Sequence, residues 1–143
     1  MIKRILIATD GSDGGNRALD AACELAKATG STLVIVTIGG DVTGAELRRL
    51  ASTGGDLSET LEARSNRILA QAGKRAKRLG ISGPVLHHAW GDPAEVIIDF
   101  IHREKADAVV IGRRGRGRLS ELLLGSVSQK VASLAPCMVI VVP

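Results

Sequence analysis

Aromatic residues are nearly absent from this sequence. Its 143 residues include one tryptophan (Trp90), one phenylalanine (Phe100) and no tyrosine. A core must therefore be packed from alanine, valine, isoleucine and leucine, and such a core suits helices laid on a buried parallel sheet. The shortage also argues against nucleic-acid binding, because proteins that bind single strands normally stack the bases on aromatic side chains.

Cysteines and long apolar runs are scarce as well. Cys23 and Cys137 are far apart and form no CxxC pair, so we expect small buried thiols in a reducing compartment and no disulfide. No stretch approaches the roughly 20 apolar residues that cross a membrane. Met1 leads straight into a strand-like run and not into a signal peptide. These features predict a single cytoplasmic domain with no membrane association.

The sequence also lacks the signatures of several enzyme classes. It contains no GxxxxGK[ST], and its glycine clusters at residues 11–15 and 112–117 do not match GxGxxG. A Walker-type ATPase and a Rossmann dinucleotide enzyme are therefore unsupported. No nucleophile stands out together with a general base and an orienting acid. His87 and His88 are neighbours on a predicted strand and point to opposite faces, so they cannot hold one metal ion together.

What the sequence does contain is an alternation of strand-like and helix-like segments. Four amphipathic patterns separate the apolar runs; they lie at residues 16–29, at 56–80, from Pro93 and from Ser126 to Leu134. This order predicts a single doubly wound α/β domain, Rossmann-like in architecture, with five parallel strands and four helices. The predicted strands are Ile2 to Thr9, Ser31 to Ile38, Pro84 to Trp90, Asp107 to Ile111 and Cys137 to Val142.

Between Gly39 and Gly55 lies a glycine-rich loop of about 17 residues, in which only Ala45 to Ala51 has a short helical pattern. Connections of more than about 12 to 15 residues usually have a function or are disordered. Because the loop follows a predicted strand, we expect it above the sheet edge that also carries Asp10. A lid over a ligand and an unstructured insertion are equally compatible with its composition.

The glycines between Gly112 and Ser128 (GRRGRGRLSELLLGSVS) are spaced like those of a phosphate-binding loop. Two residues separate Gly112 from Gly115, and nine more precede Gly125. Glycines let backbone N–H groups approach a ligand, and the first amides of the helix that follows have no partner within it. Four arginines in the loop equal the whole formal net charge of +4: Arg113, Arg114, Arg116 and Arg118. The alternative is a solvated basic loop that aids solubility.

With this motif the chain resembles the universal stress protein family, whose nucleotide-binding members hold ATP with the same glycine spacing. The resemblance extends over the chain through Thr9-Asp-Gly-Ser12, Gly91-Asp-Pro-Ala-Glu95 and the terminal Val139 to Val142 run. It departs at Arg113-Arg114, where the family more usually has a small polar residue and then His or Arg. The resemblance implies strand order 3-2-1-4-5, an adenine nucleotide α-hydrolase-like fold, and a homodimer through Cys137 to Val142.

Roles for individual residues follow from the resemblance. It implies that Thr9 and Asp10 flank the nucleoside, that Ile38 contacts adenine and that Gly112 approaches the ribose. Asp10 would also hold a Mg²⁺ that bridges phosphate oxygens. The charge and position of Arg114 add a bidentate phosphate contact. The residues implied to offer backbone or hydroxyl groups to the phosphates are Gly115, Gly125, Ser126, Val127 and Ser128.

The sequence therefore predicts a regulatory protein that binds ATP or a related adenine nucleotide. ATP, ADP and cyclic nucleotides all remain open. One alternative is a very slow ATP hydrolase that uses the same cradle to polarise the γ-phosphate. A second is a dimeric scaffold without nucleotide, against which the intact glycine spacing argues. A third is a nucleic-acid binder that uses the arginine-glycine stretch, which the lack of aromatic residues disfavours.

Overall fold

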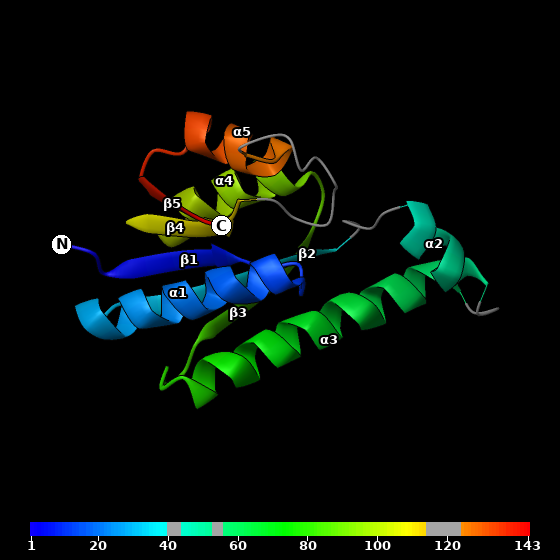
Figure 1. Cartoon of the computed structure of the whole chain (residues 1–143), viewed down its shortest axis with the longest axis horizontal. Coiled ribbons are helices and arrows are strands. Elements are labelled where there is room, and N and C mark those ends of the chain that lie inside the picture. Colours follow the sequence, from blue (N-terminus) through cyan, green and yellow to red (C-terminus); the bar gives the residue numbers. More distant parts are fainter. Residues whose placement is uncertain (40–43, 53–55, 114–123) are drawn as a thin grey trace.

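The computed structural model describes residues 1–39, 44–52, 56–113 and 124–143. It contains one sheet of five parallel strands in the order β3-β2-β1-β4-β5, which confirms the predicted topology (Figure 1). The strands are β1 (Arg4–Ala8), β2 (Thr32–Gly39), β3 (Val85–Trp90), β4 (Ala108–Gly112) and β5 (Met138–Val142).

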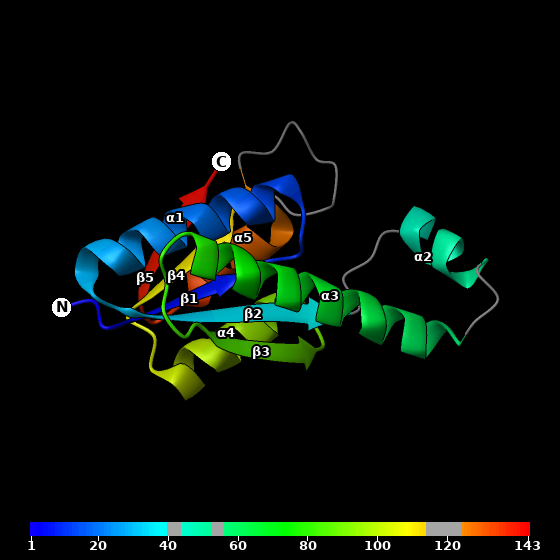
Figure 2. The ribbon, with the colours of Figure 1, turned by 90° about the horizontal axis from the view of Figure 1, so that it is seen from below.

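Helices cover both faces of this sheet (Figure 2). One face packs against α1 (Asp13–Thr29) and α3 (Leu57–Arg78), and the other against α4 (Pro93–Glu104) and α5 (Ser126–Leu134). These are the four helices expected from the sequence. The short helix expected in the long connection is α2 (Gly44–Ala51), which lies past the carboxyl ends of the strands, beside the first part of α3 (Figures 1 and 2).

The core is built from aliphatic side chains, as the composition requires. Alternate residues of β1 enter the two layers, with Ile5 and Ile7 under α1 and α3, and Leu6 under α4 and α5. All three are fully buried, and each such side chain contributes about 1.5–3 kcal/mol to stability. Phe100 is the one aromatic residue in the described core, and only 4% of it is exposed. The central strands are thereby packed against helices on both faces.

Helix α1 begins at Asp13, three residues before the predicted start at Asn16. The glycines at 14 and 15 suggested a loop, since glycine is a poor helix former. Ser12 overrides that preference because its hydroxyl accepts a hydrogen bond from Gly15 N (3.1 Å) and so caps the helix. The connection between β1 and α1 is therefore a tight turn of four residues, 9–12.

Other helix ends agree with the sequence signals. Asp92 caps α4 by accepting from Glu95 N (3.1 Å), and Pro93 occupies the first helical position. Gly30 ends α1 in the left-handed conformation, with φ 67°. The helical pattern predicted at residues 56–80 runs too far, because α3 ends at Arg78 and the next residue, Leu79, is 38% exposed.

Both cysteines are free thiols, as expected. Cys23 is buried in α1, and burial raises the pKa of its thiol to about 11. Cys137 is only half-buried, because it stands just before the edge strand β5 and not in the core interior. Burial raises the pKa of this thiol as well. Both groups are thus poor nucleophiles at neutral pH.

Candidate functional site

The order of winding reverses between β1 and β4, which lie side by side with Ile5 opposite Ala108. In doubly wound folds the carboxyl ends of two such strands border the ligand crevice. The chain beyond β1 and the chain beyond β4 therefore provide the candidate site. Thr9, Asp10 and Gly112 occupy this edge, as the sequence predicts.

The turn after β1 is fixed by its own side chains. Thr9 is 5% exposed, and its Oγ1 accepts a hydrogen bond from Gly11 N (3.2 Å). Asp10 Oδ1 accepts from Ser12 N (2.9 Å) and from the Ser12 hydroxyl. These bonds hold the Asp10 carboxylate in one position at the rim of the sheet. They also link it to the residue that caps α1.

Gly15 lets the first turn of α1 lie directly against this rim. A Cβ at this position would stand 2.7 Å from Asp10 Oδ1 and 2.8 Å from Thr9 Oγ1, closer than carbon and oxygen atoms approach without a shift. Sequence reasoning missed this role. The sequence feature that could have revealed it is the Gly14-Gly15 pair after the capping residue Ser12. Such a pair indicates that the helix backbone closely approaches a neighbouring segment, as well as a turn.

Ile38, the predicted adenine contact, lies near the end of β2 and packs partly buried on the α4 and α5 side of the core. The next residue, Gly39, supports the ring of Trp90 from β3; a Cβ at Gly39 would meet the ring at 2.7 Å. Trp90 is 47% exposed and sits edge-on to His88. At the carboxyl ends of β2 and β3 the Trp90 ring therefore packs on Gly39, a contact that the sequence alone did not indicate.

The two ends of the glycine motif are hydrogen-bonded to each other through Arg113. Arg113 N donates to Val142 O of β5 (2.7 Å), and Arg113 O accepts from Gly125 N (2.8 Å). The Ser128 hydroxyl donates to the same carbonyl (2.6 Å). Residues that are far apart in the sequence thus meet directly above the end of β4. The Ser128 side chain is 2% exposed and braces this junction, so its predicted phosphate contact would have to compete with that bond.

Helix α5 begins at this junction with an uncapped end. Gly125 is its N-cap and makes no side-chain hydrogen bond to the helix, and the first turn contains no acidic residue. The amides of the first turn and the positive end of the helix dipole are therefore available to an anion. Ser126 is exposed at the same end, and Val127 follows it.

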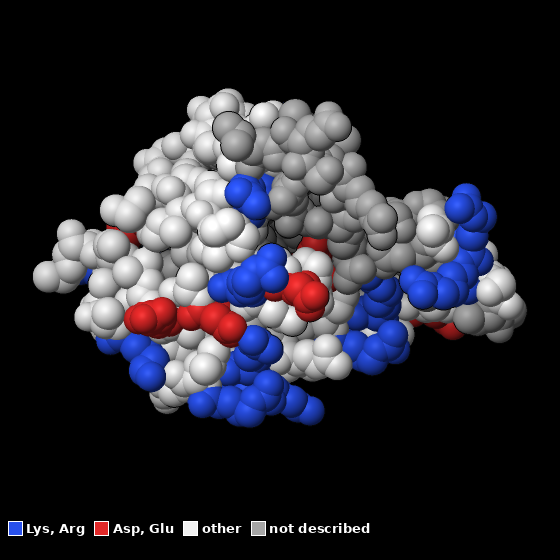
Figure 3. Space-filling model, in the orientation of Figure 1, with Lys and Arg blue, Asp and Glu red and all other residues white. Residues whose placement is uncertain are grey.

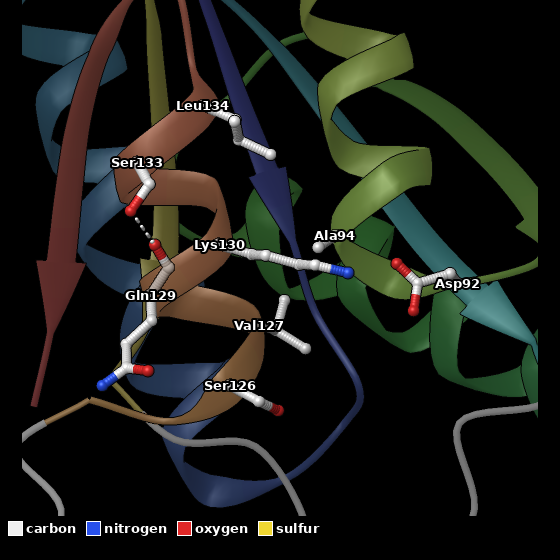
Figure 4. A pocket seen from close by; sticks show the side chains of 8 residues that line it. All are labelled: Asp92, Ala94, Ser126, Val127, Gln129, Lys130, Ser133 and Leu134. Carbon is white, nitrogen blue, oxygen red and sulfur yellow. Dashed lines mark hydrogen bonds between the residues drawn. The ribbon is translucent and has the colours of Figure 1, made fainter.

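Ser126 and Val127 also line a groove of about 500 Å³ between α4 and α5 (Figure 4). Lys130 extends from α5 across this groove, and its amine faces the carboxylate of Asp92 at the start of α4 (Figure 4). Both helices begin at the carboxyl edge of the sheet, so the groove opens beside the candidate site. A positive side chain thus lines the same groove as Ser126 and Val127.

Arg114 and Gly115 lie outside the described residues, as do Arg116 and Arg118. Arg113 is described, and its Nε is buried without a hydrogen-bond partner in the described chain. Within the same described ranges no group of three or more His, Cys, Asp or Glu residues lies together as a metal site.

The sequence of the chain is similar to those of known proteins. The sequence profile described as "Universal stress protein family" matches residues 1–143. A universal stress protein of Thermus aquaticus is 37% identical over 147 residues, which cover 99% of each chain. The chain belongs to the universal stress protein family.

Solved structures of universal stress proteins have the same fold. One, in complex with cAMP, is 27% identical with a TM-score of 0.71, and the match covers 99% of this chain and 97% of that chain. The Archaeoglobus fulgidus protein in complex with dAMP is 23% identical with a TM-score of 0.68, covering 100% and 98%. This universal stress protein therefore has the Rossmann-like, adenine nucleotide α-hydrolase-like fold of its relatives. None of its described helices is both long and apolar enough to cross a membrane.

Proposed function

We propose that this universal stress protein binds ATP or a related adenine nucleotide between the carboxyl ends of β1 and β4. The observation that carries the proposal is the junction at Arg113, which brings the end of β4 and the start of α5 together by hydrogen bonds of 2.6 to 2.8 Å. An uncapped helix end beside a topological reversal is a ready anion site. The relatives solved with cAMP and dAMP support an adenine nucleotide as the ligand.

The proposed contacts follow the order of the elements along the edge. Adenine would lie near Ile38, and the ribose would lie near Gly112 with Thr9 and Asp10 beside the nucleoside. The residues proposed to hold the phosphates are Arg114, Gly115, Gly125, Ser126, Val127 and Ser128. Asp10, whose carboxylate is already oriented by Ser12, would hold a Mg²⁺ ion, which would neutralise phosphate charge.

We propose that binding serves regulation and not catalysis. The phosphate cradle supplies positive charge, but no described side chain is arranged as a general base to position water. Slow hydrolysis is therefore the most that this geometry supports. The regulatory unit would be a cytoplasmic homodimer joined through residues 137–142. A dimeric scaffold that holds no nucleotide is the alternative, and it would leave the uncapped end of α5 without a ligand.

Ser126→Asp tests the phosphate cradle without weakening the helix. An aspartate in the first turn interacts favourably with the helix dipole, by about 0.3–1 kcal/mol, so α5 should stay folded. Its charge would repel a phosphate at the same amides. We expect the affinity for ATP, measured by titration calorimetry, to fall at least tenfold, which corresponds to about 1.4 kcal/mol.

Ser133→Asp is the matched control, because it adds the same charge to α5 about 10 Å further along the axis at 1.5 Å per residue. Its affinity for ATP should change less than threefold. Chromatography of nucleotide released from the denatured, freshly purified protein gives an independent reading. A wild type that releases no nucleotide, and that binds none of ATP, ADP, AMP or cAMP, would contradict the proposal and favour the scaffold.

A further inference from the structure

A second cleft lies between α1 and α3, on the face of the sheet opposite α5. Its volume is about 300 Å³, at the small end of the range for ligand pockets. One wall comes from the turn after β1 and the start of α1, including Thr9 and Asn16. The other wall is α3, which contributes Gln71 and three basic residues. None of the residues proposed for the phosphate cradle on α5 takes part.

A bidentate ion pair with α1 orients Arg75, one of the residues that line this α1–α3 cleft. Arg75 Nε donates to Asp20 Oδ1 (2.6 Å), and an Arg75 terminal nitrogen donates to Asp20 Oδ2 (2.8 Å). These two bonds orient the guanidinium plane and use two of its five N–H donors. The remaining donors stay available to the cleft that Arg75 lines. The Arg75 hydrogen bonds also hold the pKa of Asp20 below its ordinary value, so the pair stays charged at neutral pH.

Lys74 and Arg78 add further positive charge to the lining. Both line the cleft, and neither forms an ion pair with a described residue. With Asp20 balancing Arg75, the cleft keeps a net charge of about +2 from these two side chains. Figure 3 shows positive side chains gathered over α3, below a row of acidic side chains on α1. The positive potential therefore lies on the α3 side of the cleft.

The turn after β1 contacts α3 where Gly11 and Ile68 line the cleft. Gly11 has φ 79°, and a Cβ there would approach the Ile68 side chain to 3.1 Å, so the turn packs tightly against α3. The amides of Asn16 and Gln71 provide neutral hydrogen-bonding groups in the same lining. A preformed concave surface with a few convergent polar groups is the usual form of a small-molecule site.

We propose that the α1–α3 cleft binds a small anion that carries at least two negative charges, such as a phosphorylated metabolite. Lys74 and Arg78 would neutralise the anion, while Arg75 would offer oriented N–H donors. The volume of about 300 Å³ favours a compact ligand over a polymer. Aromatic platforms for nucleic-acid bases are also absent, since Trp90 and Phe100 do not line the cleft. The proposal is independent of the nucleotide site, with which the cleft shares only Thr9.

The test is a titration of the full chain with inorganic pyrophosphate, monitored by the chemical shifts of backbone amides in NMR spectra. The titration is carried out without ATP and again with saturating ATP. Lys74→Gln/Arg78→Gln removes the two unpaired charges. Arg67→Gln/Lys77→Gln is the matched control, because it removes the same charge from exposed positions of α3 outside the cleft. We expect pyrophosphate to shift the amide of Asn16, and its Kd to rise at least tenfold in the first variant and at most twofold in the control.

Two results would overturn the proposal. An equal rise of the pyrophosphate Kd in both double variants would mean that pyrophosphate binding depends only on the overall charge of α3. Shifts confined to Gly125 and Ser126, or abolished by ATP, would place pyrophosphate in the nucleotide cradle. If the chain binds no ATP at all, the proposed nucleotide function fails, but the Asn16 shift and the comparison of variants still decide this proposal.

Discussion

At Gly15 the backbone of α1 runs against the side chains of Thr9 and Asp10. We expect Gly15→Ala to lower the free energy of unfolding by about 1–3 kcal/mol, the usual cost of overpacking. This loss should outweigh the gain of about 1 kcal/mol that alanine brings to a helix. Urea unfolding followed by circular dichroism measures the difference. A variant more stable than wild type would show that the turn relaxes without cost.

Gly30→Ala separates this steric effect from backbone strain. A Cβ at Gly30 would meet no atom within 4 Å, so its cost comes from φ 67° alone. We expect Gly30→Ala to lower the free energy of unfolding by about 1 kcal/mol. Only Gly15→Ala should also weaken nucleotide binding, because only that position adjoins the proposed site.

Individual site residues could be predicted only in part. Thr9, Asp10 and Gly112 follow strand-like runs, so sequence pattern and parallel topology put them at one edge. The contact of Gly15 with that edge depends on how closely a helix approaches a strand, which local pattern does not encode. The bond between Ser128 and the Arg113 carbonyl likewise depends on tertiary folding across an intervening segment. The predictions for Arg114 and Gly115 fall outside the described residues.

Among the elements, the end of α4 is tied to two strands by Glu104. Its carboxylate accepts from Arg4 of β1 and lies 2.6 Å from His87 Nε2 of β3. Burial alone would raise the pKa of Glu104, but the hydrogen bonds from Arg4 and His87 outweigh it and hold this pKa below the ordinary 4.5. The carboxylate therefore stabilises the fold at pH values above about 4.5, and this contribution is lost as the pH falls through the lowered pKa.

Glu104→Gln should flatten the acid side of the stability profile. We expect the free energy of unfolding of the wild type to fall between about pH 4.5 and pH 2, and that of the variant to fall less steeply. The variant should also be less stable at neutral pH, because the Arg4 and His87 contacts weaken. Urea unfolding at a series of pH values measures both effects. Glu24→Gln, at an exposed position of α1, is the control. If its free energy of unfolding falls as gradually at acidic pH as that of Glu104→Gln, the loss of stability in acid is not due to Glu104.

The elements themselves were largely predictable because each carries a local signal. Asp92-Pro93 marked the start of α4, and Gly30 marked the end of α1. The start of α1 was misjudged because two glycines disguised the cap at Ser12. Leu79 was misjudged because helical periodicity continued past the point where α3 ends. The capping serine decided the first boundary, and at the second the helix ends two residues before Gly80, which has φ 94°.

For the whole molecule, the edge strand β5 is the feature that bears on assembly. Among the described strands it pairs with β4 alone, and Met138 at its start is 53% exposed. Unpaired edges favour association with another strand, and a lysine on such an edge discourages it. We expect the wild type to sediment at twice its chain mass of 14.9 kDa, and Met138→Lys to sediment as a monomer.

Analytical ultracentrifugation at micromolar concentration measures this. Lys105→Met, at a position off both edge strands, is a control that should leave the dimer intact. A wild type that sediments as a monomer would contradict the proposed homodimer. A Met138→Lys variant that remains dimeric would place the interface elsewhere.

The fold as a whole was predicted through two kinds of information. Alternating apolar runs and helical stripes led to the doubly wound class, whereas the strand order came from the resemblance to a family. The α1–α3 cleft was not foreseen. Its basic residues Lys74 and Arg78 are exposed on α3, and only the packing of that helix beside α1 brings them into one lining with Asn16.

Trp90 rests on Gly39 at the end of β2, one residue beyond Ile38, and the chain contains no tyrosine and no second tryptophan. Its intrinsic fluorescence therefore comes from a single indole that is half in contact with solvent. The molecule thus carries an optical reporter at the sheet edge where the nucleotide is proposed to bind, and it requires no attached dye.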